Sequence, residues 1–240
     1  MDTTEDTNAP QSETFLSVNA VTNALDYLES AAHFLERRDD FKWKWIAISV
    51  YHALYSFCIL ALEKGNPEWT LSYGRNDDDG RYCKRGQETR WSKSKQNRFG
   101  SGPAYRIEWE ETDEEPSESK VEEDDLAWTR RKLIGFWTAI ARIQDERSIV
   151  HDVVSKPVAV TDEDLRAIQW LALRVRNELI HFVPKFWDIS IEGIQSGSSS
   201  ALKVIESLVF ESHTLYRIDE DGRCRIRKAI DSLRSGLTTR

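Results

Sequence analysis

The alternation of apolar and polar positions predicts helices along most of this 240-residue chain. From Val18 to Arg38, apolar residues recur at three- and four-residue steps and mark one face of a helix. Asp39 and Asp40 break that pattern, and the run 41–64 that follows is apolar nearly all round. Such a run is typical of a helix at the centre of a bundle. Serines and a histidine interrupt it, so we interpret it as a buried helix rather than a membrane span.

Helical patterning resumes in the second half of the chain. The segment 124–146 begins with aspartates, which suit the N-terminus of a helix. Thr161 opens the next predicted helix, because the sequence TDED offers a capping hydroxyl with an acid three residues later. Pro184 ends that helix. In 189–218, the sequence GIQSGSSS predicts a break before a clear amphipathic segment, and a short basic helix completes the chain.

A long polar region, 66–123, separates the second and third predicted helices. A stretch of this length between helices is either a functional insertion or disordered. Its first part interleaves cationic and aromatic residues, and its second part, Glu108 to Asp125, is strongly acidic. The alternation in AYRIEWE suggests a short strand. The basic part could hold single-stranded RNA, because cations neutralise phosphates and aromatic rings stack on bases; equally, it could fold over its own acidic half. The candidate RNA contacts are Arg81, Lys84, Arg85, Arg90 and Trp91.

These elements predict an all-α fold, an antiparallel four- to five-helix bundle with the polar insertion between its second and third helices. The sequence has no repeat period and no strand–helix alternation of the kind that builds a parallel sheet. We expect a disordered N-terminus at 1–15 and a single helical domain at 16–218, with 66–123 as an inserted polar loop. A basic C-terminal segment at 219–240 follows.

Net charge and cysteine spacing disfavour several classes of protein. The net charge of −8 disfavours a general nucleic-acid coat protein, which needs a dominant positive field, although a local basic patch is compatible with it. Cys58, Cys83 and Cys224 show no paired spacing, so we expect neither a disulfide framework nor a zinc cluster. The acidic, polar N-terminus does not resemble a signal peptide. The chain is therefore expected to be cytoplasmic, with no metal site.

Five polar residues interrupt the apolar run of the fourth predicted helix, in the sequence RVRNELIH from Arg174 to His181. On an α-helix, residues four apart lie about 40° apart and residues seven apart about 20° apart, so Arg174, Asn177 and His181 would share a face. Arg176 would lie about 140° from His181. The simplest interpretation is a surface arginine with a histidine near the C-terminal carbonyls.

The same residue types also suit metal-free RNA cleavage by the 2′-hydroxyl. A histidine can transfer a proton near neutral pH, a guanidinium can hold a phosphate and its developing charge, and an asparagine can orient either partner. Elsewhere in the sequence, His52 lies in the apolar run 41–64. We interpret it as a packed core histidine, with the lining of a groove as the alternative.

The sequence RNELIH, Arg176 to His181, resembles the R-x4-6-H signature of HEPN domains (higher eukaryote and prokaryote nucleotide-binding), in which a polar residue, often asparagine, follows the arginine. Arg174 satisfies the looser form of the signature. The sequence WIAISVYHALYSFCILALEKG is similar to the N-terminal helix of such domains, and FVPKFWDISIEG resembles the proline–aromatic exit from their motif helix. The resemblance covers about half of the chain, residues 18–64 and 125–210.

The resemblance implies a four- or five-helix bundle that forms a homodimer, with two motif helices facing each other in one composite site. It implies a metal-independent endoribonuclease without a cofactor, whose RNA products end in 2′,3′-cyclic phosphate. Many bacterial members are toxins or defence effectors with an antitoxin protein as partner, and none of this requires a membrane. Some antitoxins adenylylate a tyrosine two residues after the histidine, where this chain has Val183. Other members only bind nucleotides or partners.

Carried onto this sequence, the signature assigns roles to five residues. His181 would act as general acid or base, Arg176 would bind the scissile phosphate, and Asn177 would orient them. Arg174 and Glu178 would support this set. A catalytically silent binding module and a purely structural helical scaffold are the alternatives.

Overall fold

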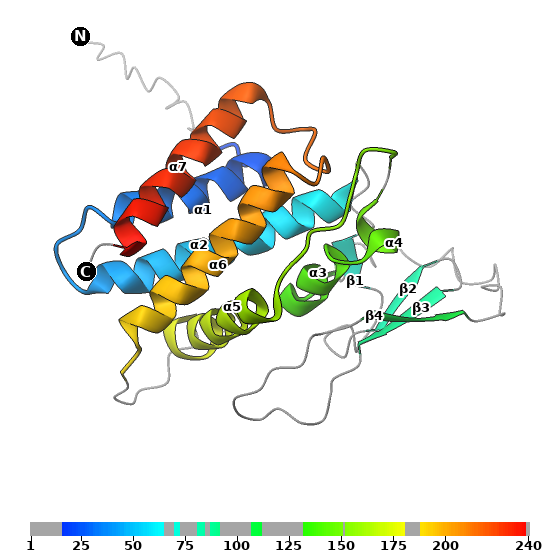
Figure 1. The fold of residues 1–240 in the computed structure, drawn as a ribbon, viewed down its shortest axis with the longest axis horizontal. Helices are drawn as coiled ribbons and strands as arrows, with labels where there is room; N and C mark the ends of the chain where they lie inside the picture. Colours follow the sequence, from blue (N-terminus) through cyan, green and yellow to red (C-terminus); the bar gives the residue numbers. More distant parts are fainter. Residues whose placement is uncertain are drawn as a thin grey trace, which may run out of the picture.

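The computed structural model describes residues 16–64, 70–72, 81–84, 87–91, 107–111, 132–150, 152–180 and 188–238. Helices make up most of these residues (Figure 1), which confirms the all-α class predicted from the sequence. The described residues also include five short strands, all within the polar insertion or just after it: β1 (Leu71–Ser72), β2 (Arg81–Lys84), β3 (Gln87–Trp91), β4 (Ile107–Glu111) and β5 (Lys132–Leu133). The N-terminal residues 1–15, predicted to be disordered, lie outside the described residues.

The first two helices pack along each other. α1 spans Ala20–Phe34 and begins with a capping box: Asn19 Oδ1 accepts a hydrogen bond from the Thr22 backbone N–H at 2.9 Å, and Thr22 Oγ1 accepts one from the Asn19 N–H at 3.0 Å. α2 spans Phe41–Glu63 and ends at Lys64, whose φ of 47° is left-handed. Residues 41–64 were predicted as one helix, so the sequence pattern located α2 to within one residue.

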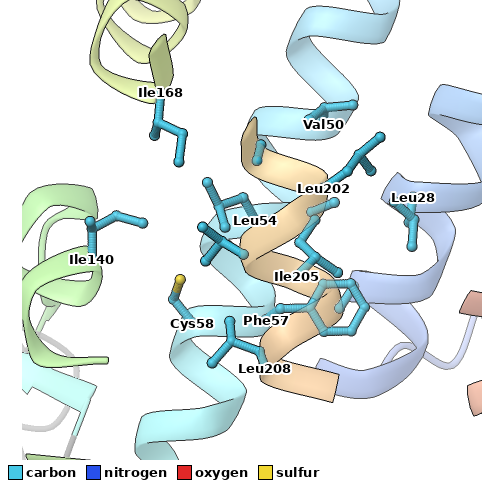
Figure 2. Close-up of a cluster of buried hydrophobic side chains, with 14 of the residues drawn as sticks. Leu28, Val50, Leu54, Phe57, Cys58, Ile140, Ile168, Leu202, Ile205 and Leu208 are labelled. Atoms are coloured by element: carbon cyan, nitrogen blue, oxygen red, sulfur yellow. The ribbon is translucent and has the colours of Figure 1, made fainter. Parts of the chain in front are cut away.

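α2 is the centre of the hydrophobic core, and four helices pack against it: α1, α3 (Phe136–Arg142), α5 (Asp162–Arg174) and α6 (Ile191–Phe210). One described helix, α2, is long and apolar enough to cross a membrane, and 61% of its most apolar window is buried inside the fold. Burial of a large apolar side chain contributes about 1.5–3 kcal/mol, so this helix anchors its neighbours. Figure 2 shows buried side chains that meet around α2 in this core, among them Leu28, Leu54, Phe57, Ile140, Ile168, Leu202, Ile205 and Leu208.

α6 spans Ile191–Phe210 without interruption, so the break predicted at GIQSGSSS was wrong. The small residues do not end the helix; they let α5 approach it. A Cβ at Gly197 would lie 2.6 Å from Leu171 Cβ and 2.9 Å from the Ala167 carbonyl oxygen. Ser190 caps the helix instead, because its hydroxyl accepts a hydrogen bond from the Gly193 N–H at 3.1 Å.

α7, Glu220–Thr238, carries the basic C-terminal segment and packs against α1 and α6. Its apolar positions are buried, and three of its arginines pair with acids of the two neighbouring helices. Arg225 Nη2 lies 2.7 Å from Glu29 Oε2 of α1. Arg227 and Arg234 both pair with Glu206 of α6, and hydrogen bonding to Arg234 lowers the pKa of that carboxyl. The basic residues of this segment are therefore in part structural.

The segment 124–146, predicted as one helix, is helical only from residue 136 among its described residues. β5, Lys132–Leu133, pairs antiparallel with β1, Leu71–Ser72, and the Ile134 N–H donates to the Thr70 carbonyl at 2.9 Å. Gly135 is extended (φ −63°, ψ 158°), and two short helices follow. The prediction failed because strand pairing with a distant segment outweighed local helical periodicity. These helices are α3, Phe136–Arg142, and α4, Glu146–Ile149.

Candidate functional site

α5, Asp162–Arg174, carries the motif segment at its C-terminal end (Figure 1). Thr161 caps it, as the sequence TDED predicted, because the Asp164 N–H donates to Thr161 Oγ1 at 3.1 Å. Asp164 also accepts hydrogen bonds from Ser200 Oγ at 2.7 Å and Lys203 Nζ at 2.8 Å, both on α6. Burial raises the pKa of Asp164, but the hydrogen bonds from Lys203, Ser200 and Thr161 outweigh it and lower that pKa overall. The start of α5 is thus fixed on α6.

The helix changes type at the motif. From Val175 to Ile180 the backbone forms a π-helix, η5. Hydrogen bonds in a π-helix connect residues five apart instead of four, and π-helical turns are frequent at functional sites. The prediction from the sequence assumed about 100° per residue, which holds for an α-helix but not for this segment. Because Asn177 lies in the π-helix, the angle between it and Arg174 differs from the α-helical value that placed them on one face.

Arg174 is held by its neighbours in the helix. Its Nη1 donates to Glu178 Oε1, and its guanidinium lies 5.7 Å from the ring centroid of Trp170. The same ring covers Gly193 of α6, where a Cβ would lie 2.4 Å from a ring carbon. Gly193, Trp170, Arg174 and Glu178 thus form a chain of contacts from α6 to η5, which we call the Arg174 stack.

Glu178 has one carboxylate oxygen without a donor. Its side chain is 15% exposed, and Oε2 is buried with no hydrogen-bond partner among the described residues. A buried acceptor in this state costs free energy. Two apolar side chains next to the stack face solvent: Leu173 is 46% exposed and Ile180 is 42% exposed.

The other predicted site residues are described only in part. Arg176 and Asn177 belong to η5, but only their backbone is described, and His181 lies outside the described residues. Of the five predicted site residues, the structure thus shows a contact between two, Arg174 and Glu178. Among the described residues, no group of three histidine, cysteine, aspartate or glutamate side chains is arranged to hold a metal ion.

His52 lies on α2 among aromatic rings. It stacks on Tyr27 of α1 with ring centroids 5.0 Å apart, and Tyr51 meets it edge-on at 5.2 Å. Burial lowers the pKa of His52 below its usual 6.5. These contacts agree with its interpretation as a packed core histidine.

The lowered pKa of His52 predicts a loss of stability in mild acid. As the pH falls below about 6.5, the unfolded chain binds a proton at this residue before the folded chain does, so the free energy of unfolding decreases. We expect His52→Phe, which keeps an aromatic ring against Tyr27, to reduce this decrease. Urea unfolding at about pH 7.5 and about pH 5 measures it, with the same change at the exposed His33 of α1, His33→Phe, as the control. An unchanged pH dependence in His52→Phe would contradict the expectation.

Four of the predicted RNA contacts of the insertion lie on a three-stranded antiparallel sheet made of β2, Arg81–Lys84, β3, Gln87–Trp91, and β4, Ile107–Glu111. They are Arg81, Lys84, Arg90 and Trp91. The register pairs position 81 with 90 and position 90 with 108. A strand of the basic half thus lies beside a strand of the acidic half, as the alternative interpretation of this segment required. Arg85 lies outside the described residues, and β4 confirms the strand suggested by AYRIEWE.

Sequence reasoning missed a cavity of about 790 Å³ at the corner between α1 and α2. We call it the corner cavity. It is bounded by the end of α1, the start of α2, the start of α6 and the end of α7. The available signal was the alternation of basic and aromatic residues in FKWKW, Phe41 to Trp45, shortly after Arg37 and Arg38. The cavity is lined by Leu35, Arg38, Asp40, Lys42, Trp43, Ile191, Glu192, Gln195 and Gly236.

Comparison with known proteins gives no relative: no protein-family model, no curated protein and no solved structure matches this chain.

Proposed function

We propose that this chain is a HEPN-like helical domain that cleaves RNA as a metal-independent endoribonuclease. His181 acts as general acid or base, Arg176 binds the scissile phosphate and stabilises its developing charge, and Asn177 orients both. In the reaction, the RNA 2′-oxygen loses its proton and attacks the adjacent phosphorus. The bond to the 5′-oxygen breaks, that oxygen takes up a proton, and one product ends in 2′,3′-cyclic phosphate.

The observation that carries this proposal is the change from α- to π-helix at Val175. Arg176 and His181 are five residues apart. An α-helix separates two such residues by about 140°, whereas a π-helical turn brings residues five apart into the neighbouring positions that α-helical residues four apart occupy. A wide turn that begins at Val175 therefore suits a site in which Arg176 acts together with a residue five positions later in the sequence. Arg174 suits the role of the motif arginine less well, because its guanidinium already donates a hydrogen bond to Glu178.

We propose further that the active form is a homodimer in which two copies of η5 face each other. One copy's histidine then serves as base and the other as acid. The exposed apolar side chains of Leu173, which precedes the motif, and of Ile180, which lies within it, support a protein contact there. A cytoplasmic role as a bacterial toxin or defence effector, with an antitoxin as partner, follows from the resemblance and belongs to the same proposal.

A cleavage assay tests the chemistry. The purified chain is incubated with end-labelled RNA of random sequence in excess EDTA. We expect cleavage that leaves 2′,3′-cyclic phosphate ends, and a rate at least about a hundredfold lower in His181→Ala, because general acid–base catalysis contributes this much. Intact RNA with the wild-type chain, or an equal rate in His181→Ala, would reject the proposal.

The alternative function is a catalytically silent HEPN-like module that binds a nucleotide or a partner protein. The corner cavity favours this alternative, because the volume of the cavity is typical of small-molecule sites and two basic side chains, Arg38 and Lys42, belong to its lining residues. The same assay separates the two functions, since a silent module leaves the RNA intact at every protein concentration.

A further inference from the structure

The corner cavity is lined by two basic residues. Arg38 and Lys42 both line it, and neither pairs with a carboxylate among the described residues. Lys42 Nζ lies 5.1 Å from the ring centroid of Trp43, which is only 8% exposed and forms part of the wall. The adjacent Arg37, by contrast, forms an ion pair: its Nη2 lies 3.0 Å from Asp39 Oδ2. Two cations thus remain available at one concave surface.

Two helix N-termini also lie at the corner cavity. α2 starts at Phe41 and α6 starts at Ile191, and residues of both first turns line the walls. The N-terminus of a helix carries a partial positive charge and favours anions. Two such ends, together with two unpaired cations, suit a phosphate group better than a neutral ligand.

Two acidic residues and an amide residue also line the cavity: Asp40, Glu192 and Gln195. The two acids balance the charges of Arg38 and Lys42, so the lining suits a bare anion poorly. Asp40 makes no side-chain capping bond to α2. Hydrogen bonds from its own backbone N–H and from Ser190 lower the pKa of Glu192, so this group stays ionised near neutral pH. A fitting ligand must therefore bring hydroxyl or amino donors as well as a phosphate.

We propose that the corner cavity binds a ribonucleotide, with its phosphate at Arg38 and Lys42 and its ribose or base donors at Asp40, Glu192 and Gln195. The nucleotide is either free or one unit of an RNA strand. The strand form rests on the proposed ribonuclease function, because such a unit would lie next to the cleaved bond; the free form does not. The start of α6 connects the cavity to the motif region, since Ile191 lines the cavity and Gly193 lies under Trp170 of the Arg174 stack.

The chain offers two matched controls. Lys44, two residues after Lys42, lies over Trp45 at 5.0 Å just as Lys42 lies over Trp43, but it does not line the cavity. Arg37 is likewise next to Arg38 and outside the lining. Each control variant removes the same charge from the same corner, so any effect of net charge is equal within a pair.

Binding is measured in the His181→Ala background, so that the proposed cleavage does not degrade the RNA probe. Calorimetry follows the four ribonucleoside 5′-monophosphates and inorganic phosphate, and fluorescence anisotropy follows a labelled single-stranded RNA. We expect at least one mononucleotide or the RNA to bind more tightly than inorganic phosphate. Arg38→Ala and Lys42→Ala should each raise the Kd about tenfold, as for the loss of one charge-assisted hydrogen bond. Arg37→Ala and Lys44→Ala should change it less than about twofold.

The outcomes distinguish the sources of the ligand. Weakened binding of free mononucleotides in the two cavity variants identifies a nucleotide site; weakened binding of RNA alone identifies a subsite for the strand. Absence of binding to both probes, or equal losses in Lys42→Ala and Lys44→Ala, overturns the proposal. None of these binding measurements requires cleavage. If the wild-type chain leaves RNA intact in the cleavage assay while the cavity still binds nucleotides, the ribonuclease function is refuted and this inference stands.

Discussion

Arg176→Ala is expected to lower the single-turnover rate of RNA cleavage by about a thousandfold, while Arg174→Ala leaves most of it. In the proposed site, Arg176 stabilises the charge that develops on the phosphate, and the loss of one such donor costs about 10²–10³ in rate. Arg174 is engaged elsewhere, because Glu178 accepts its hydrogen bond and Trp170 lies beneath its guanidinium. These contacts of Arg174 favour Arg176 as the motif arginine, the assignment that the asparagine directly after it also favours.

The two variants differ in stability as well as in rate. Arg174→Ala removes the only described partner of the Glu178 carboxylate, so we expect it to lower the free energy of unfolding by about 1 kcal/mol. Arg176→Lys keeps the charge but loses the planar, bidentate donor, and should recover only part of the rate. If Arg174→Ala abolishes cleavage and Arg176→Ala does not, the arginine seven residues before His181 is the motif residue, and the role given to the π-helical turn is wrong.

Local signals in the sequence located several elements correctly. The capping pattern TDED placed the start of α5, because a threonine hydroxyl and an acid three residues later satisfy free backbone N–H groups without any tertiary contact. The run around α2 is apolar nearly all round, which directly indicates a helix covered on several sides. Both predictions depend only on neighbouring residues.

Features that depend on distant segments were not predictable in this way. The break predicted at GIQSGSSS treated glycine as a helix breaker, but Gly197 meets α5 at distances that exclude a side chain, and the Trp170 ring of α5 covers Gly193. Which helix approaches a glycine is a property of the fold. Likewise, the pairing of β5 with β1 replaced a helical turn by a strand, although the residues themselves are compatible with a helix.

The candidate site shows the same division. Polar residues within an apolar helical run identified Arg174, Glu178 and the cluster around them. The helical periodicity used for the prediction is about 3.6 residues per turn, so it could not indicate the π-helix η5. The corner cavity brings Arg38 and Lys42 together with Gln195, more than 150 residues away in the sequence, so no short motif encodes it. Residue types indicate which chemistry is available; only the packing of α1, α2, α6 and α7 brings these groups into one cavity.

Gly197→Val is expected to lower the free energy of unfolding by about 2–3 kcal/mol, the cost typical of overpacking at a close helix–helix contact. A Cβ at this position would lie 2.6 Å from Leu171 Cβ and 2.9 Å from the Ala167 carbonyl oxygen, and neither atom is the flexible end of a side chain. α5 and α6 must then separate, which exposes part of the core between them. For a chain of this size, the melting temperature should fall by about 5–10 °C.

Ser196→Val is the matched control, because it introduces the same side chain at an exposed position of the same helix. Intrinsic helix propensity alone predicts the opposite order, since valine is a better helix former than glycine but not clearly better than serine. Differential scanning calorimetry of both variants therefore separates helix propensity from packing. A melting temperature of Gly197→Val at or above that of Ser196→Val would show that α5 and α6 do not meet closely at this residue, and the Arg174 stack, which depends on the same approach at Gly193, would lose its support.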